Sequence, residues 1–451
     1  MKYLYVFSSD FCYTIKTIEN RGTNMNNKSI VSSSSIGGLI QRTLNRVDKR
    51  LVNHGIRVAY LVSGMLKEQG KYPISQQREQ ILTAILHDIG AYKTEEIDRM
   101  VQFECEDVWE HSIYGYLFLR NLSPVSVYAD AVLHHHTSSV SLNRFDIEHR
   151  ELAQMIHLAD RADTFLQNST NRKALFSFMQ NAAGTVFDEE IVELFLQADQ
   201  NFHLVSTLKD HHDLNVLLYD DGTSDKSGDE YLRMLIYAID FRSQHTVTHT
   251  ITTMYISNAV ARLMELPSES LPHIYYGAML HDLGKIGIPV EILEFPGKLS
   301  PQAMTIMRTH VDITEEILNG DVDTVTANIA LRHHEKLDGS GYPRGLTESE
   351  LTLEEQIVGV ADIVSALVGT RSYKSSFSKE RTLSILKEQS AAGKLNAKVV
   401  DVIVGHFDEI MGEVRSQCEP ILKIYQGIQE EYKILLAKYK SQTNNEPAAI
   451  S

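Results

Sequence analysis

The feature that most constrains this chain is a series of histidine and aspartate residues that occurs twice along its 451 residues. Each series runs in the same order: a single His, a His-Asp pair, a second His, adjacent His residues and a final Asp. The first series is His54, His87, Asp88, His111, His134, His135 and Asp160, and the second is His249, His281, Asp282, His310, His333, His334 and Asp362. Corresponding positions lie 194 to 202 residues apart, and ILHDIG in the first half parallels MLHDLG in the second. This repetition predicts a tandem duplication of one domain.

The segments around these residues favour helices. Proline is scarce, at 10 residues, and apolar residues recur at i, i+3, i+4 and i+7 rather than in alternation. We therefore predict an all-α chain made of two related helical domains. The predicted parts are a partly disordered leader at 1–44, a first domain at 45–205, a polar linker at 206–229, a second domain at 230–410, and a C-terminal helix and tail at 411–451.

The C-terminal helix leaves two interpretations open. Pro420 is predicted to begin it, because proline is tolerated in the first turn of a helix. Apolar and aromatic residues then follow in steps of four and three: Ile421, Tyr425, Ile428, Tyr432, Leu435 and Tyr439. This short heptad pattern fits a helix packed on its own domain, and it equally fits a helix that pairs in a homodimer.

Composition excludes several classes of protein. The formal net charge of −16 argues against binding to a nucleic acid polymer, which requires a basic face. No stretch reaches eighteen apolar residues, so we predict no membrane span. Ser8, Ser9 and Asp10 interrupt the opening segment before a signal peptide could form. With only Cys12, Cys105 and Cys418, and no paired spacing, the chain suits a reducing cytoplasm.

The repeated series predicts metal binding. Imidazole and carboxylate donors without thiolate suit Fe, Mn, Ni or Zn rather than Ca or Mg. A lone His on an apolar helix is more often a hydrogen-bonded core residue, but an ordered set repeated in both halves is hard to obtain that way. A helix through residues 240–260 would place His245 and His249 on one face. Gly284 is the predicted end of the helix that carries His281 and Asp282.

The blocks HDLGK at 281–285 and HHEKLDGSGYP at 333–343 resemble the HD-GYP phosphodiesterases of bacteria. The first half looks like a degenerate HD domain, as in phosphodiesterases that degrade 3′3′-cyclic GMP-AMP. The resemblance implies two HD-type helical bundles. It also implies hydrolysis of a cyclic dinucleotide second messenger, 3′3′-cGAMP or cyclic di-GMP, to a linear dinucleotide by a hydroxide that bridges two metal ions.

The resemblance also implies roles for individual residues. One ion would be held by His249, His281, Asp282 and Asp362, and the other by His310, His333 and His334, with Asp282 bridging. Fe or Mn is expected ahead of Ni or Zn. Lys285 would contact the scissile phosphodiester, and Arg371 and Lys374 would contact the rest of the dinucleotide. His245 is a candidate ligand for a third ion, because some family members carry a metal-binding glutamate at that position.

The first half departs from the family at several positions. Ala91 stands where the second half has Lys285, no Gly-Tyr-Pro follows the histidines, and Ser169 replaces Arg371. We therefore predict a degenerate metal site that supports or regulates the catalytic half. Two alternatives to the whole interpretation stay open: an HD-type nucleotide phosphohydrolase, and a non-catalytic cyclic dinucleotide-binding protein.

Overall fold

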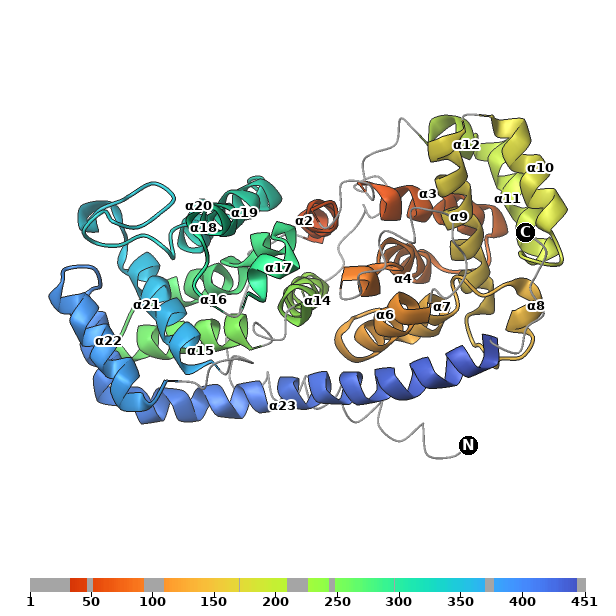
Figure 1. Ribbon diagram of the computed structural model, residues 1–451. Coiled ribbons are helices and arrows are strands. Elements are labelled where there is room, and N and C mark those ends of the chain that lie inside the picture. Colours follow the sequence, from red (N-terminus) through yellow and green to blue (C-terminus); the bar gives the residue numbers. More distant parts are fainter. Residues whose placement is uncertain are drawn as a thin grey trace. The chain divides into compact units, whose positions relative to one another are not determined.

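The chain is helical throughout the part that the structure, a computed structural model, describes (Figure 1). The described residues are 33–46, 52–92, 109–169, 171–208, 226–242, 248–295, 297–369 and 377–443. Among these residues there is no β-strand, and the pairs Ala183–Phe187 and Asp338–Thr347 form isolated β-bridges. The predicted all-α class is confirmed.

The described residues divide into two compact units. Unit 1 comprises those up to Arg46 and those from 226 to Gln426, and unit 2 comprises those from 52 to 208 and from Gly427 to 443. The helices of unit 1 are α2 (Ser33–Leu44), α14 (Lys226–Arg242), α15 (His249–Leu263), α16 (Ser270–Leu280), η4 (Leu283–Gly287), α17 (Val290–Leu293), α18 (Pro301–Arg308), α19 (His310–Leu318), α20 (Thr324–Leu331), η5 (Glu348–Glu350), α21 (Leu353–Val368) and α22 (Lys379–Ala391). Those of unit 2 are α3 (His54–Gln69), α4 (Ile74–Ile85), η2 (Ile89–Tyr92), α6 (Trp109–Leu122), η3 (Ser126–Tyr128), α7 (Ala129–Leu133), α8 (Ser139–Leu142), α9 (Arg150–Asn168), α10 (Arg172–Ala182), α11 (Glu189–Phe202) and α12 (Leu204–Thr207).

The same helix pairs pack together in both units. In unit 2, α3 packs on α4 and α9, and α6 packs on α7 and η2. In unit 1, α15 packs on α16 and α21, and α19 packs on α20 and η4. Because the order of these elements along the chain is also the same, each unit is one copy of a single helical arrangement. The predicted tandem duplication is confirmed.

A glycine in each unit allows the short helix after the His-Asp pair to touch the next helix. A Cβ atom on Gly284 would lie 1.9 Å from the carbonyl oxygen of His310, and one on Gly90 would lie 2.0 Å from that of His111. Both distances are far below van der Waals contact, so only glycine fits. The prediction that Gly284 ends a helix is wrong, because α16 already ends at Leu280 and Gly284 lies inside η4. Its close contact brings Asp282 next to His310.

Helix α21 shows how the chain places a polar group in the core. Its start is fixed by a capping box, in which the side chains of Thr352 and Glu355 each accept a hydrogen bond from the other residue's backbone amide. The buried face of the helix carries Val358, Ala361 and Asp362. A buried carboxylate needs hydrogen-bonding or charged partners, so this position points to a polar centre inside unit 1.

Helix α2 belongs to unit 1, although the sequence placed its residues in the leader. Leu39 and Ile40 are fully buried, and the Arg42 guanidinium donates to the carbonyl oxygen of Ile317 at 2.6 Å and pairs with Asp321. The apolar face of α2 is short, which is why sequence reasoning missed it. Residues 1–32 lie outside the described residues.

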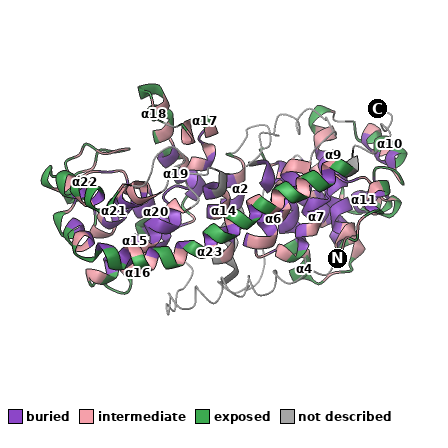
Figure 2. Cartoon of the chain, turned by 60° about the horizontal axis from the view of Figure 1, so that its bottom comes forward, coloured by how far each residue is buried: buried purple, intermediate pink, exposed green. Residues whose placement is uncertain are grey.

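Helix α23 (Ala397–Thr443) contributes to both units. Its backbone leaves helical geometry at His406 and stays helical through Pro420, so the prediction that Pro420 begins a helix is wrong. The predicted apolar seam packs inside the chain: Ile421 and Ile428 are buried, and Tyr439 stacks on Trp109 with ring centroids 4.3 Å apart. Figure 2 shows the exposed residues along the other face of this helix. Pairing in a homodimer stays a prediction.

None of the described helices is both long and apolar enough to cross a membrane. The predicted domain boundaries also stay predictions, because the two units draw residues from both sides of them.

Candidate metal centre

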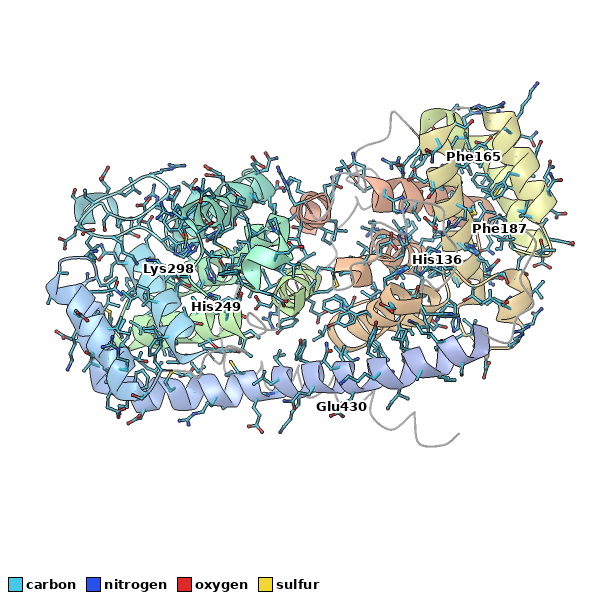
Figure 3. The ribbon with its side chains drawn as sticks, viewed as in Figure 1. His136, Phe165, Phe187, His249, Lys298 and Glu430 are labelled. Carbon is cyan, nitrogen blue, oxygen red and sulfur yellow. The ribbon has the colours of Figure 1, made fainter. Side chains whose placement is uncertain are left out.

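The second His/Asp series converges inside unit 1. His249 and His310 are the first residues of α15 and α19, and Asp362 lies in the middle of α21. His281 and Asp282 fall between α16 and η4, while His333 and His334 directly follow α20. Three groups have ligand atoms within 4.8 Å of one another: His249, His281 and Asp362; His281, Asp282 and His333; and His310, His333 and His334. Figure 3 labels His249 among the helices of this unit.

Asp282 lies between the two ends of the cluster. Its Oδ2 atom is 3.2 Å from Nε2 of His249 and 3.1 Å from Nε2 of His281, whereas its Oδ1 atom is 3.6 Å from Nε2 of His310. Asp362 faces the first end, with Oδ1 3.1 Å from Nε2 of His249. One carboxylate that offers an oxygen to each of two histidine groups is the arrangement that bridges a pair of metal ions.

The imidazoles are held with one nitrogen turned toward the cluster. Nδ1 of His281, His310 and His333 each donates to the carbonyl oxygen three residues earlier, at 2.7 Å in all three cases. This bond places the proton on Nδ1 and leaves the lone pair on Nε2, as in metal-binding histidines. Nε2 of His310 and Nε2 of His333 are buried and have no hydrogen-bond partner. Buried acceptors without partners are costly, so these atoms fit a metal ion.

His249 is oriented differently, by a serine. The Ser365 hydroxyl donates to the carbonyl oxygen of His249 at 3.0 Å and lies 2.9 Å from its Nδ1, which therefore donates back to the hydroxyl oxygen. Nε2 is again the atom that faces the carboxylates. Ser365 lies three residues after Asp362 on α21, so one helix supplies both a candidate ligand and the group that orients another.

The charges of the cluster shift its pKa values in opposite directions. Burial lowers the pKa of His310 and of His333, and it lowers that of His334 to about 3. These imidazoles are therefore neutral near pH 7, which is the form that binds metal. Burial would also lower the pKa of His249, but its hydrogen bonds with Asp282 and Asp362 outweigh burial and raise the pKa to about 9. Burial favours protonation of Asp282, yet the charges of His281 and Lys285 hold its pKa well below the usual range.

Lys285 reaches back to the cluster from η4. Its Nζ donates to Oδ2 of Asp282 at 2.5 Å, and its side chain is 19% exposed. Burial opposes the charged ammonium, but Asp282 and Asp362 outweigh that effect and raise the pKa of Lys285. A permanent positive charge therefore lies beside the candidate ligands, at the edge that solvent can reach.

The loop that contains Gly341, Tyr342 and Pro343 packs against the cluster. Tyr342 lies over the ring of His334, with centroids 4.6 Å apart, and the Arg308 guanidinium lies 4.7 Å from the Tyr342 ring. The buried Glu335 carboxylate accepts from the backbone amides of Arg344 at 2.7 Å and Leu346 at 3.0 Å. Sequence reasoning assigned no role to Glu335 or Arg308. The position of Glu335 directly after the two histidines was the available signal for the first.

Three predicted site residues lie outside the described residues: His245, Arg371 and Lys374. Their roles stay predictions. The expected helix through residues 240–260 is wrong at Thr248, which caps α15 with non-helical angles of φ −123° and ψ 2°. His249 is therefore the first residue of α15 and not an interior residue of a longer helix.

The first His/Asp series converges in unit 2 in the same way. Two groups have ligand atoms within 4.8 Å of one another: His54, His87 and Asp88; and Asp88, His111, His135 and His136. Asp160 joins them, with Oδ1 3.3 Å from Nε2 of His54. Nδ1 of His87 and of His135 donates to the carbonyl oxygen three residues earlier, at 2.7 and 2.6 Å. The pattern is the one found at His281 and His333.

His134 is the exception among the predicted residues. Its ring packs against Trp109, Phe145 and Tyr439, and burial lowers its pKa to about 4. The register is shifted by one residue: His135 takes the place predicted for His134, and His136 takes the place predicted for His135. The rings of His135 and His136 lie 3.9 Å apart, as do those of His333 and His334. Three adjacent histidines made the register ambiguous. The preceding apolar residues, AVL before His134 and IAL before Arg332, were the signal that would have fixed it.

Two further residues of unit 2 were not anticipated. The Asp163 carboxylate accepts from Nδ1 of His54 at 2.7 Å and is itself held by Arg57 and Gln167. Arg161 lies within hydrogen-bonding distance of His136. The offset between the halves pairs Asp163 with Ser365 and Arg161 with Ile363. Neither Ser365 nor Ile363 was a predicted site residue, so the sequence offered no signal for these two contacts.

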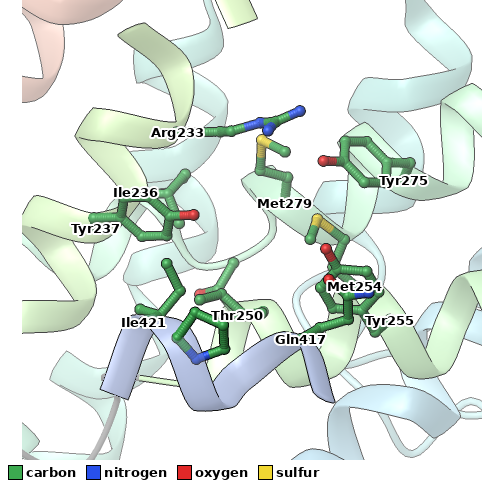
Figure 4. Close-up of a pocket in the computed structure, with 12 residues that line it drawn as sticks. Arg233, Ile236, Tyr237, Thr250, Met254, Tyr255, Tyr275, Met279, Gln417 and Ile421 are labelled. Carbon is green, nitrogen blue, oxygen red and sulfur yellow. The ribbon is translucent and has the colours of Figure 1, made fainter. Parts of the chain in front are cut away.

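Unit 1 also contains a pocket away from the cluster, between α14, α15, α16 and α23 (Figure 4). Three tyrosines, Tyr237, Tyr255 and Tyr275, line it together with Met254, Met279 and Arg233. None of its lining residues is a candidate metal ligand.

The chain is similar to known proteins over both units. Residues 51–164 and residues 233–399 each match a family described as HD domain. The chain is 28% identical over 390 residues to 3′3′-cGAMP-specific phosphodiesterase 1 of Vibrio cholerae, covering 81% of this chain and 89% of that protein.

Two further relatives match one half. A cyclic di-GMP phosphodiesterase of Thermotoga maritima is 38% identical over 192 residues, 42% of this chain and 52% of that protein. The cyclic di-GMP phosphodiesterase response regulator RpfG of Xanthomonas campestris is 37% identical over 191 residues, which cover 41% of this chain and 50% of that protein. The matches span about half the length of these two relatives.

Among solved structures, the crystal structure of the cyclic GMP-AMP-specific phosphodiesterase V-cGAP3 of Vibrio cholerae superposes with a TM-score of 0.53 at 18% identity, covering 84% of this chain and 98% of that one. This likeness concerns the fold. With a matching domain in each unit and the same helix order in both, the chain is an HD-domain protein that carries two HD domains in tandem.

Proposed function

We propose that unit 1 hydrolyses a phosphodiester bond of a cyclic dinucleotide to give a linear dinucleotide. The observation that carries this proposal is the pair of histidine groups joined by Asp282, with the ammonium of Lys285 beside it. The relative that spans both units is specific for 3′3′-cGAMP, which makes this the first candidate substrate. Cyclic di-GMP is the second, because the two relatives that act on it are 37% and 38% identical over the shorter stretches that they match.

The donor set of unit 1 fits two divalent transition-metal ions. His249, His281, Asp282 and Asp362 would hold one, and His310, His333, His334 and the second oxygen of Asp282 would hold the other. Buried nitrogen atoms without partners and carboxylates in the same cavity suit Fe or Mn, with Ni or Zn as alternatives. When bound, such ions supply a water molecule of lowered pKa and neutralise charge on phosphoryl oxygens.

The side chains around the ions would bind and orient the substrate. The Lys285 ammonium, held at Asp282 in the structure, would contact a non-bridging oxygen of the scissile phosphodiester, where negative charge grows during the reaction. Asp282 would thus position both the ions and the lysine. We propose the same substrate-binding role for Arg371 and Lys374 as their sequence positions predict, and a third-ion role for His245.

The loop that follows His334 would form one wall of the site. Glu335 fixes its backbone through two amide hydrogen bonds, and Tyr342 is held between His334 and Arg308. Tyr342 covers one ligand ring and would limit access of water to it. The neighbouring guanidinium of Arg308 would suit a phosphate group of the nucleotide.

The test is hydrolysis by the full chain, purified anaerobically with its metal content measured. We expect cleavage of 3′3′-cGAMP, with cyclic di-GMP and a nucleoside triphosphate tested beside it, and loss of cleavage in the His281→Ala/Asp282→Ala variant. Faster hydrolysis of the triphosphate would favour an HD-type nucleotide phosphohydrolase. Tight binding of a cyclic dinucleotide without cleavage by the metal-loaded protein would make it a binding protein.

A further inference from the structure

Arg161 is a cation of unit 2 that has no counterpart in unit 1. It directly follows Asp160, and the residue in the same place after Asp362 is Ile363. Its Nη2 atom lies 3.1 Å from Nδ1 of His136 and 3.3 Å from Oδ2 of Asp160, and its side chain is 12% exposed. A guanidinium thus lies within the second histidine group of unit 2.

The contact between Arg161 and His136 fixes where the protons are. A guanidinium has only donors, so Nδ1 of His136 must accept. A neutral imidazole that accepts at Nδ1 carries its proton on Nε2. That atom lies 3.1 Å from Nε2 of His111, so His136 donates to His111. The lone pair on Nδ1 of His136 then accepts from Arg161, and the lone pair on Nε2 of His111 accepts from His136. Neither lone pair is left for a metal ion.

Unit 1 shows the opposite state at the corresponding atoms. Nε2 of His310 and Nε2 of His333 have no hydrogen-bond partner. Nδ1 of His334 lies 3.5 Å from Oδ2 of Asp362, as Nδ1 of His136 lies 3.6 Å from Oδ2 of Asp160, but Ile363 stands in the place of Arg161. In unit 2 only His135 of the second group keeps a buried Nε2 without a partner. The second group of unit 2 therefore has fewer free donors than its counterpart.

The first group of unit 2 keeps donor atoms that could hold a metal ion. Nε2 of His87 and both carboxylate oxygens of Asp88 are buried without hydrogen-bond partners. Nε2 of His54 lies 3.6 Å from Asp88 and 3.3 Å from Asp160, and Asp163 fixes the other nitrogen of its ring. A carboxylate behind a ligand histidine orients the ring and raises its basicity.

We propose that unit 2 binds a single divalent ion, held by His54, His87, Asp88 and Asp160, and that the guanidinium of Arg161 takes the place of the second ion. The inference rests on the proposed two-ion site of unit 1 as its reference. It gives a physical reason why unit 2 would bind metal without hydrolysing a phosphodiester. Two ions could not bind the phosphoryl oxygens together, and Ala91 supplies no ammonium where unit 1 has Lys285.

The experiment counts metal in unit 2 alone. In the full chain with His281→Ala, Asp282→Ala and His333→Ala, loaded with Mn²⁺ under anaerobic conditions and desalted, we expect about one ion per chain and the electron paramagnetic resonance spectrum of an isolated ion. Adding Arg161→Ile should raise the count to about two and give the spectrum of a coupled pair. Arg161→Gln is a second variant, in case the isoleucine is not tolerated.

Two controls match these variants. Adding His87→Ala should remove the ion, and Ile363→Arg, placed in a chain with His87→Ala and Asp88→Ala, should reduce unit 1 from about two ions to about one. Two coupled ions with Arg161 intact, no ion at all, or a count unchanged in both Arg161 variants would each overturn the proposal. Because no substrate is involved, these outcomes are independent of whether unit 1 hydrolyses a cyclic dinucleotide.

Discussion

Units 1 and 2 each bring their series of His and Asp residues together in a similar cluster, called here the ligand cage. They differ in the residues around it. Lys285 in unit 1 corresponds to Ala91 in unit 2, and Ser365 corresponds to Asp163. The loop fixed by Glu335 follows the histidines only in unit 1, since Thr137 takes that place in unit 2. The cage itself is set by helix ends and close glycine contacts that both units share. The two units therefore differ in the side chains that surround the candidate ligands. These surrounding side chains determine what chemistry the cage can support, and they do not determine whether the cage forms.

The largest expected effect separates the two units by activity. His281→Ala with Asp282→Ala should lower kcat/KM for the cyclic dinucleotide by about 10³-fold or more, because it removes one ligand of the first proposed ion and the carboxylate that both ions would share. The matched pair His87→Ala with Asp88→Ala should leave kcat/KM within about threefold, since the ligands of unit 1 remain. Steady-state kinetics with circular dichroism as a folding control measures both. Equal losses in the two variants would contradict the assignment of hydrolysis to unit 1.

Lys285 should matter for catalysis without holding metal. Lys285→Ala is expected to lower kcat by about 10²–10³-fold, the usual loss when one group that stabilises transition-state charge is removed. Metal content should stay unchanged, because Nζ is not a ligand. Lys387→Ala, at an exposed lysine of α22, is the control. A variant that loses its metal together with its activity would show that Lys285 acts through the stability of the cage.

The Asp163 carboxylate, which binds the outer nitrogen of His54, should increase the metal affinity of unit 2. Asp163→Asn removes the charge behind His54 and is expected to weaken metal binding in that unit by about 10–100-fold. Ser365→Ala in unit 1 should weaken it less, because a serine supplies no charge. Metal titration in chains with the other unit's ligands removed compares them, with the exposed Asp146→Asn as control. Equal losses would mean that charge behind the ring is unimportant here.

The pH dependence of metal binding gives the finest comparison. Folding raises the pKa of His249 to about 9 and that of His54 to about 10, so both rings are in the positively charged, doubly protonated form near pH 7 when no metal is bound. An ion must displace that proton, and apparent affinity should therefore rise by about tenfold per pH unit. The rise should end near pH 9 for unit 1 and continue toward pH 10 for unit 2. Calorimetry in buffers of different ionisation enthalpy counts the released protons, and binding independent of pH would rule out this mechanism.

The sequence by itself determined the helical class, the duplication and most members of both cages. Ordered His and Asp residues at repeated spacing carry that information because imidazole and carboxylate groups are common metal ligands and because helices of similar length place them alike. The choice between His134 and His136 was different. Three adjacent histidines satisfy the same pattern, and only the end of α7, which turns His135 and His136 inward, separates them.

The tertiary structure alone decided which side chains lie behind the ligands. Asp163 meets His54, which is 109 residues away in the chain, and Arg161 meets His136, which is 25 residues away. Glu335 meets the amides of a loop that folds back onto it. No local periodicity encodes such contacts, because they depend on how close two helices approach and on which rotamer fits there. The sequence thus specified two clusters of histidine and aspartate residues, and packing specified which charged and aromatic side chains surround each cluster.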